Sequence, residues 1–118
     1  MALEKTGVID RVGVEAGTGR VVLTVVDEMD WVDDQRHLLA LQQKLNTYLS
    51  FVERGEVFRR LARAGGPVVP RTTPVKVGIV ARHPFPAYAM AFLEYARHVF
   101  ESSGMELSCE VEREVRDA

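Results

Sequence analysis

The segment from residue 105 to residue 112 alternates strictly between apolar and polar side chains, and this pattern constrains the fold more than any other in the chain. A period of two predicts a β-strand with one side packed in a core and the other side in water. A sheet with one wet face must receive its helices on the opposite face. The last strand therefore predicts a two-layer arrangement.

Three further strands are predicted before it. Residues 8–15 alternate loosely, and residues 20–26 are rich in β-branched side chains and apolar on both sides. Gly17 and Gly19 lie between these segments and supply the positive φ that a tight turn needs. The two segments therefore predict a hairpin whose second strand is the more buried one. Residues 75–82 alternate again and predict the third strand.

The longest predicted helix spans residues 33–54 and begins with two aspartates. Apolar side chains recur at steps of three and four, which is the spacing of one helix face; they are Leu38, Leu41, Leu45, Tyr48 and Val52. Carboxylates suit the first turn, because free N–H groups point toward them there. Gly55 is placed to end the helix in a left-handed conformation.

The second half of the chain predicts one more long helix. Residues 57–64 favour a short helical piece, and the prolines between residues 67 and 74 make the next stretch a loop. The long helix is expected to begin at Pro86 and to end at Gly104. We therefore predict an α+β fold, a two-layer ββαβαβ sandwich in which two helices cover one face of a four-stranded mixed sheet. The third and fourth strands are expected to be parallel, with a right-handed crossover.

Length and composition indicate one cytoplasmic domain. The 118 residues fit a single domain over residues 1–118, and 47% apolar residues are enough for a core. Cys109 is the only cysteine, so no intramolecular disulfide forms, which favours a reducing compartment. The N-terminus lacks the basic and apolar regions of a signal peptide, and no apolar run is long enough to span a membrane. We expect no membrane partner.

Two segments carry a resemblance to a known family. The chain has LTVVD at residues 23–27, then Trp31, then HLLALQQKLNTYLSFVERGE at residues 37–56. With Val8-Ile9-Asp10 and the closing strand–helix–glycine–strand order, these segments resemble a bacterial family of unknown function, domain of unknown function 6572, over most of the chain. The resemblance implies the same fold and a bacterial cytosolic setting. It implies no functional residue, because the family has no established activity.

Two features suggest catalytic or metal chemistry, and each has a simpler explanation. Asp33 and His37 stand four residues apart on one helix face, but a metal site needs three or four converging ligands. An acid-rich, solvated helix start is the better interpretation. Cys109 occupies an inward position of the last strand, where cysteine behaves as a small apolar residue and is inert. We assign no catalytic residue, no cofactor and no metal.

A ligand site is the alternative function for this chain. Arg82, His83 and Phe85 follow the third strand, at the end of the sheet where α/β proteins often bind ligands. The start of the next helix follows at once and is able to receive an anion beside Arg82. The hypothesis is a small-molecule or anion-binding protein, or a minor enzyme, with its site there. The competing interpretation is a stiff connection in which Phe85 covers the core.

Basic residues are concentrated between residues 54 and 82, where seven arginines and lysines accompany a single acid, Glu56. Nucleic-acid binding requires a basic face together with a recognisable reading element, and the second requirement is not met. The isoelectric point near 5.9 also argues against it. Nucleic acid is therefore an improbable partner.

The polar side of the first helix is the leading functional candidate. Gln42, Asn46 and Ser50 form one row at i,i+4 spacing, and Gln43 with Thr47 forms the adjoining row. A solvated helix usually carries Glu, Lys and Arg, which favour helix formation more than Asn, Thr and Ser do. Neutral polar groups lose their water at less cost than charges, which suits a protein contact. The alternative is that these side chains bond to loops of the same molecule.

The sequence therefore predicts a non-enzymatic protein–protein interaction module that works through this helix, with a homodimer among the possible assemblies. Trp31 lies beside an acidic cluster at residues 27–34 and is predicted to anchor a basic partner there. A second interpretation has Trp31 holding the strand to the start of the helix.

Overall fold

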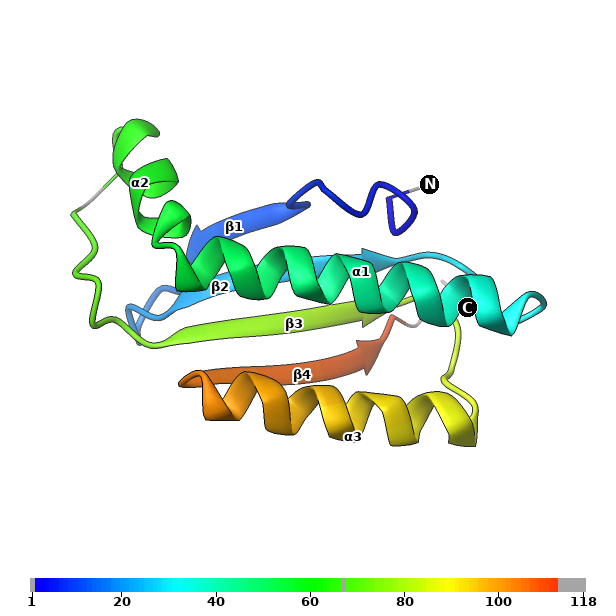
Figure 1. Ribbon diagram of the computed structural model, residues 1–118. Helices are drawn as coiled ribbons and strands as arrows, with labels where there is room; N and C mark the ends of the chain where they lie inside the picture. Colours follow the sequence, from blue (N-terminus) through cyan, green and yellow to red (C-terminus); the bar gives the residue numbers. More distant parts are fainter. Residues whose placement is uncertain (1, 67, 113–118) are drawn as a thin grey trace, which may run out of the picture.

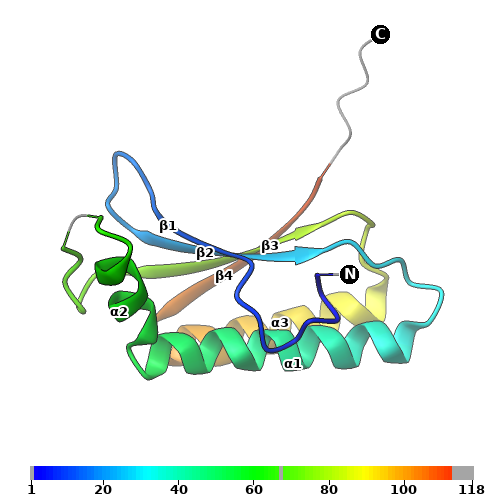
Figure 2. The same ribbon diagram turned by 90° about the horizontal axis from the view of Figure 1, so that it is seen from above.

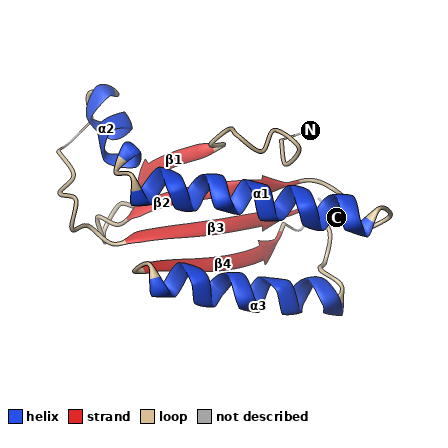
Figure 3. Ribbon diagram, in the orientation of Figure 1, coloured by secondary structure: helices blue, strands red, loops and turns tan. Residues whose placement is uncertain are grey.

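The computed structural model describes residues 2–66 and 68–112. Four strands and three helices follow one another along this part of the chain (Figures 1 and 3). In order they are β1 (Arg11–Val14), β2 (Val21–Asp27), α1 (Asp34–Glu53), α2 (Glu56–Arg63), β3 (Val75–Ala81), α3 (Ala87–Ser102) and β4 (Met105–Val111).

The strands form one mixed sheet in the order β1-β2-β3-β4. β1 pairs antiparallel with β2, whereas β2, β3 and β4 are mutually parallel, as predicted for the third and fourth strands. Both crossovers step in the same direction across the sheet, and right-handed crossovers of that kind bring their helices to one face. Figure 2 shows α1 and α3 on the same side of the sheet. The α+β class and the four-stranded mixed sheet are confirmed.

The short helical piece predicted at residues 57–64 forms α2, so the predicted ββαβαβ order with two helices lacks one helix. Its N-cap is Gly55, whose φ of 72° lies in the left-handed region and turns the chain away from α1. A Cβ at this position would lie 2.7 Å from a guanidinium nitrogen of Arg71, which could move aside, so it is the left-handed φ that favours glycine here. Only Val57 of α2 is buried. A helix of eight residues with one core residue shows too little apolar periodicity in the sequence to be predicted as part of the helical layer.

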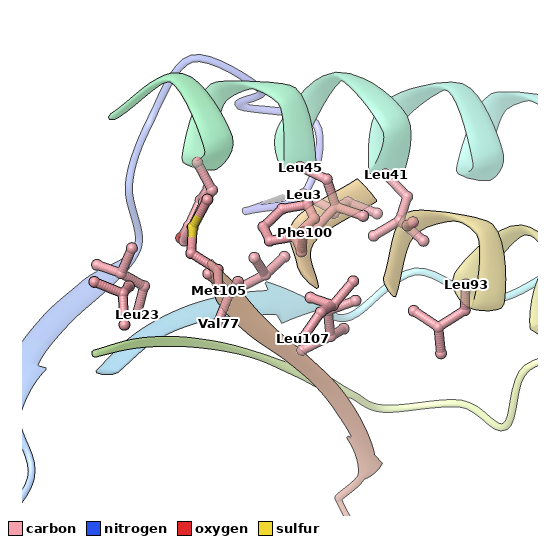
Figure 4. Close-up of a cluster of buried hydrophobic side chains, with 14 of the residues drawn as sticks. Leu3, Leu23, Leu41, Leu45, Val77, Leu93, Phe100, Met105 and Leu107 are labelled. Atoms are coloured by element: carbon pink, nitrogen blue, oxygen red, sulfur yellow. The ribbon is translucent and has the colours of Figure 1, made fainter. Parts of the chain in front are cut away.

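The core lies between the sheet and the pair α1 and α3. Alternate residues of β2 and β3 point into it, so each strand has a buried and a half-buried side. Figure 4 shows how Leu41 and Leu45 of α1 meet Leu93 and Phe100 of α3 and Leu107 of β4. The buried stripe of α1 includes three of the five predicted residues, Leu41, Leu45 and Tyr48, while Leu38 and Val52 are half-buried. It also includes His37 and Lys44, which the apolar spacing did not reveal.

Lys44 is a buried charge whose partners all belong to the N-terminal segment. Its side chain has no exposed surface. The Nζ atom donates to the carbonyl oxygens of Ala2 and Lys5, each at 3.0 Å, and to Oδ1 of Asp10 at 2.9 Å. Three acceptors satisfy the three N–H bonds of the ammonium group. Lys44 therefore fastens residues 2–10, the N-terminal arm, against α1.

Asp10 extends the same network to the sheet. Its Oδ2 accepts from the backbone N–H of Val26 at 2.9 Å, beyond the last residue pair of β1 and β2. Its own N–H donates to the Tyr48 hydroxyl at 2.7 Å, and that hydroxyl donates to the carbonyl of Thr24. Burial raises the pKa of Tyr48, so the hydroxyl stays protonated and able to donate. The arm, α1 and β2 are thus held by one set of buried polar contacts.

Replacing Lys44 with alanine should destabilise the fold by about 3 kcal/mol, because it leaves Oδ1 of Asp10, on a side chain only 11% exposed, and the carbonyls of Ala2 and Lys5 without their donor. Urea unfolding measures this loss, and hydrogen exchange should show faster exchange in residues 2–10 than elsewhere. Lys5→Ala is the matched control, since the Lys5 side chain is exposed and makes no hydrogen bond within the described residues. Equal stability of the two variants would contradict this role.

Candidate functional site

The polar row predicted on the first helix lies on the outer face of α1, which points away from the sheet. Gln42, Gln43 and Asn46 are exposed, and Thr47 and Ser50 are half-buried. Thr47 bonds only within its own helix, through Oγ1 to the carbonyl of Gln43 at 3.1 Å. Among the described residues, the side chains of the other four find no hydrogen-bond partner. No described loop of the molecule therefore forms a hydrogen bond with the side chains of this row.

On one side, the outer face of α1 borders a groove against α3. Figures 1 and 2 show the two helices running side by side in the same direction. The groove has a volume of about 190 Å³, and Gln42 and Asn46 contribute its polar rim. Its remaining lining is mainly apolar and includes Leu49, Phe92 and Tyr95. Tyr95 is 70% exposed, so an aromatic ring stands free at the edge of this α1–α3 groove.

On the other side, the outer face of α1 borders a larger hollow of about 670 Å³. The N-terminal arm forms one wall with residues 7–9, and α1 forms the floor with residues that include Asn46, Thr47 and Ser50. Arg54 and Arg60 supply two guanidinium groups at the end near α2. The Arg60 guanidinium lies 6.0 Å from the centre of the Phe51 ring, within range of a cation–π contact. This basic hollow and the α1–α3 groove share Asn46.

The arginines around α2 have no carboxylate partners within the described part of the chain. None of the five forms an ion pair with a described residue; they are Arg54, Arg59, Arg60, Arg63 and Arg71. Arg59 donates only to the backbone carbonyl of Arg54, at 3.2 Å. Elsewhere, Arg20, Arg36 and Arg97 are each paired with a glutamate. Positive charge therefore predominates next to the outer face of α1, although Glu56 also lines the basic hollow, and it attracts anionic groups.

Trp31 belongs to a different part of the molecule, at the start of α1. Its ring stacks on His37, with 3.5 Å between the ring centres, and meets the edges of Phe85 at 5.0 Å and Tyr88 at 6.0 Å. Trp31 and Phe85, predicted for two separate sites, thus lie together in one aromatic cluster. The structure does not bring Trp31 next to the polar row of α1.

Beneath Trp31 lies a buried histidine–aspartate pair. Nε2 of His37 is 2.6 Å from Oδ2 of Asp27, and neither side chain has any exposed surface. Nδ1 of His37 lies 2.8 Å from the carbonyl of Asp30, and a carbonyl only accepts, so Nδ1 must carry a hydrogen. Burial raises the pKa of Asp27, and the hydrogen bond from His37 opposes that rise. The pair is sealed from solvent and links the end of β2 to α1.

Asp27 was missed in the sequence although a signal for it exists. Asp27 follows Val21, Leu23 and Val25 at steps of two along β2, so its carboxylate was to be expected on the same side of the strand, facing the core. Such a residue requires a buried partner, and His37 is that partner. The pairing predicted between His37 and Asp33 is therefore replaced, and Asp33 instead caps the helix by accepting from the N–H of Arg36.

Arg82, His83 and Phe85 occupy the connection from β3 to α3. The Arg82 side chain is exposed, and its backbone N–H donates to the carbonyl of Asp27 at 2.8 Å. His83 is half-buried, and Phe85 packs against Trp31. Across the described residues, no three His, Cys, Asp or Glu side chains are placed to hold a metal ion.

Asp27→Ala should destabilise the protein by about 3 kcal/mol, whereas Asp27→Asn should cost much less. The alanine variant leaves Nε2 of His37 and the N–H of Met29, which donates to Oδ1 of Asp27 at 3.1 Å, without partners. An asparagine offers both a donor and an acceptor in the same place. Urea unfolding of the two variants measures the difference. An equal loss of stability in both variants would contradict this prediction, because it would show that a hydrogen-bonding amide does not replace the carboxylate of Asp27.

Cys109 should react slowly with iodoacetamide while the chain is folded. It is half-buried against the core, and burial together with the nearby carboxylates of Asp27 and Glu110 raises its pKa to about 11. The thiolate is the reactive form, so alkylation at pH 8 should be about 100-fold slower than in urea and should rise about tenfold per pH unit toward pH 10. Mass spectrometry follows the reaction. Equal rates in buffer and in urea would contradict the buried placement.

No helix among the described residues combines the length and apolar character that crossing a membrane demands. No curated protein and no solved structure was found to match the chain. A match was found to one family, the family of unknown function DUF6572, over residues 1–113. That span includes every strand and helix described above, together with the α1–α3 groove and the basic hollow. The chain therefore belongs to the family of unknown function DUF6572.

Proposed function

We propose that the protein is a non-enzymatic interaction module that binds an acidic, amphipathic segment of another protein across the outer face of α1. One observation carries the proposal: unpaired amide and hydroxyl side chains lie between an apolar groove and arginines that have no carboxylate partner among the described residues. We place this module in the bacterial cytoplasm, in keeping with its single cysteine.

Each part of the surface favours such a partner. The α1–α3 groove offers Leu49, Phe92 and Tyr95 to apolar side chains, and an exposed aromatic ring such as Tyr95 is typical of interface anchors. Arg54 and Arg60 offer planar guanidinium groups, which bind carboxylates with two parallel hydrogen bonds. The amide side chains between them exchange water for partner hydrogen bonds at a low cost.

The charge at this surface also distinguishes protein from nucleic acid. Only the basic hollow would attract a phosphate backbone, whereas the adjoining groove is apolar and suits leucine-like side chains. The chain as a whole carries a net charge of −2, which opposes a polyanion. A segment that combines apolar and acidic residues satisfies both halves of the surface.

A non-enzymatic role is supported by the state of the His37–Asp27 pair. A histidine next to a carboxylate has the composition of a general base, but a general base must reach its substrate directly or through one water. Both side chains are fully buried beneath Trp31. Their role is to join β2 to the start of α1.

A photo-crosslinking amino acid placed at position 46 tests the proposal in cells. It should capture one defined protein, and mass spectrometry should map the crosslink to a segment rich in acidic and apolar residues. Position 35 is the matched control, because Gln35 is another exposed amide on α1 but lies in its first turn. Crosslinks to the same proteins from both positions, or to a basic segment, would overturn the proposal.

A synthetic peptide of the captured segment then measures the contribution of each part. Combined alanine substitution of Gln42, Asn46 and Ser50, or Tyr95→Ala alone, should weaken peptide binding by about tenfold or more, since each removes contacts at the centre of the surface. Gln35→Ala should leave binding unchanged. Isothermal titration calorimetry provides the constants, and unchanged affinity in both surface variants would refute the assignment.

A further inference from the structure

We infer that a second copy of this chain covers the open face of the sheet, giving a two-fold dimer that uses none of the outer face of α1. Figure 2 shows that α1 and α3 lie on one side of the sheet, while none of the described helices covers its other side. This open face consists of the half-buried side chains of β2 and β3 with their neighbours in β1 and β4. Its centre holds Val22, Val26 and Val80 together with Lys76.

Parallel strands are rarely left with a bare face, and their two sides are usually both covered and both apolar. β2 and β3 are parallel to each other and stand at the centre of the sheet. Their open side carries Val22, Val26 and Val80 beside Thr24, Gly78 and Lys76. Half of these six positions are therefore apolar, which leaves a strip of valines on a face that also holds polar side chains.

Two glycines on the open face lack an explanation within the molecule. Gly13 in β1 lies opposite Val22, and Gly78 in β3 lies opposite Thr24, so both belong to this face. Neither has a positive φ, and an added Cβ would meet nothing within 4 Å at Gly13 and only Ser108 at 3.7 Å at Gly78. Glycine weakens a strand interior and often marks the close approach of another molecule.

The charges at the two edges of the sheet indicate that the molecule covering the open face is a second copy of this chain. The β1 edge carries Arg11, and the β4 edge carries Glu110; neither makes an ion pair within the described residues, whereas Glu106 pairs with Arg20 of its own chain at 3.0 Å. A two-fold axis parallel to the strands places the β1 edge of one copy over the β4 edge of the other. Arg11 then lies level with Ser108 of its mate, next to Glu110.

The same two-fold axis also brings complementary residues of the two copies together at the centre of the open face. It places β2 of one copy over β3 of the other, so Val26 meets Val80 and Thr24 meets the space left by Gly78. Each contact occurs twice, as a two-fold interface requires. The valines supply the apolar centre and the glycine supplies the room for close packing.

The area of the face sets the strength of the dimer. Three strands of seven residues and β1 with four, at about 4.8 Å spacing and about 3.3 Å rise per residue, give a flat footprint of roughly 400 Å² per copy. Two copies therefore bury roughly 800 Å², below the roughly 1,200 Å² of standard interfaces. We expect a reversible dimer with a dissociation constant in the micromolar range.

Analytical ultracentrifugation from about 1 to 500 μM tests the inference by a charge swap. The protein should show a monomer–dimer equilibrium that Arg11→Glu weakens at least tenfold, because it places like charges together. Glu110→Arg should weaken it as well, and the double variant should restore the dimer. Arg11 and Glu110 are exposed, so circular dichroism should show an unchanged fold in all three proteins.

The variant with alanine at positions 42, 46 and 50 separates this inference from the proposed function. It should dimerise like the unaltered protein, since these residues lie on the opposite side of the molecule. A protein that stays monomeric throughout the concentration range would overturn the inference, as would a dimer that survives Arg11→Glu undiminished or is broken by the helix variant. None of these results would bear on partner binding at the outer face of α1.

Discussion

The ammonium group of Lys44 is the interaction on which the arrangement of this domain depends. It is fully buried and is satisfied by two carbonyls of the N-terminal arm and by Asp10. A charge removed from water in this way stabilises the fold only while every partner is present. Because Asp10 also binds the N–H of Val26, the position of α1 over β2 and the course of the arm are set together. The wall of the basic hollow follows from this one contact.

The first turn of α1 is fixed by different chemistry. His37 joins Asp27 at the end of β2, and Trp31 covers the pair. Phe85 adds the connection between β3 and α3 to the same cluster. The site where parallel sheets often hold ligands is thus occupied by aromatic side chains that secure α1. Because α1 is held through its inner side at its first turn and at its middle, its outer face takes no part in holding the helix, which is what an interaction surface requires.

The two sides of the sheet have separate tasks in the account proposed above. The helical side offers an apolar groove and unneutralised arginines to an acidic partner. The open side offers valines, glycines and complementary edges to a second copy of the chain. A dimer built in this way turns its two helical faces outward, so both copies remain able to bind.

Local patterns in the sequence determined the strands, the two long helices and the side of the sheet that they cover, because period and turn chemistry are properties of neighbouring residues. They also placed Gln42, Asn46 and Ser50 on one helix face. Only the tertiary structure decided what borders that face, since the arm, α2 and α3 come from distant segments. It likewise revealed that His37 and Lys44 are core residues. A polar side chain enters a core only when its partner is brought there by the fold, and no local pattern encodes that meeting.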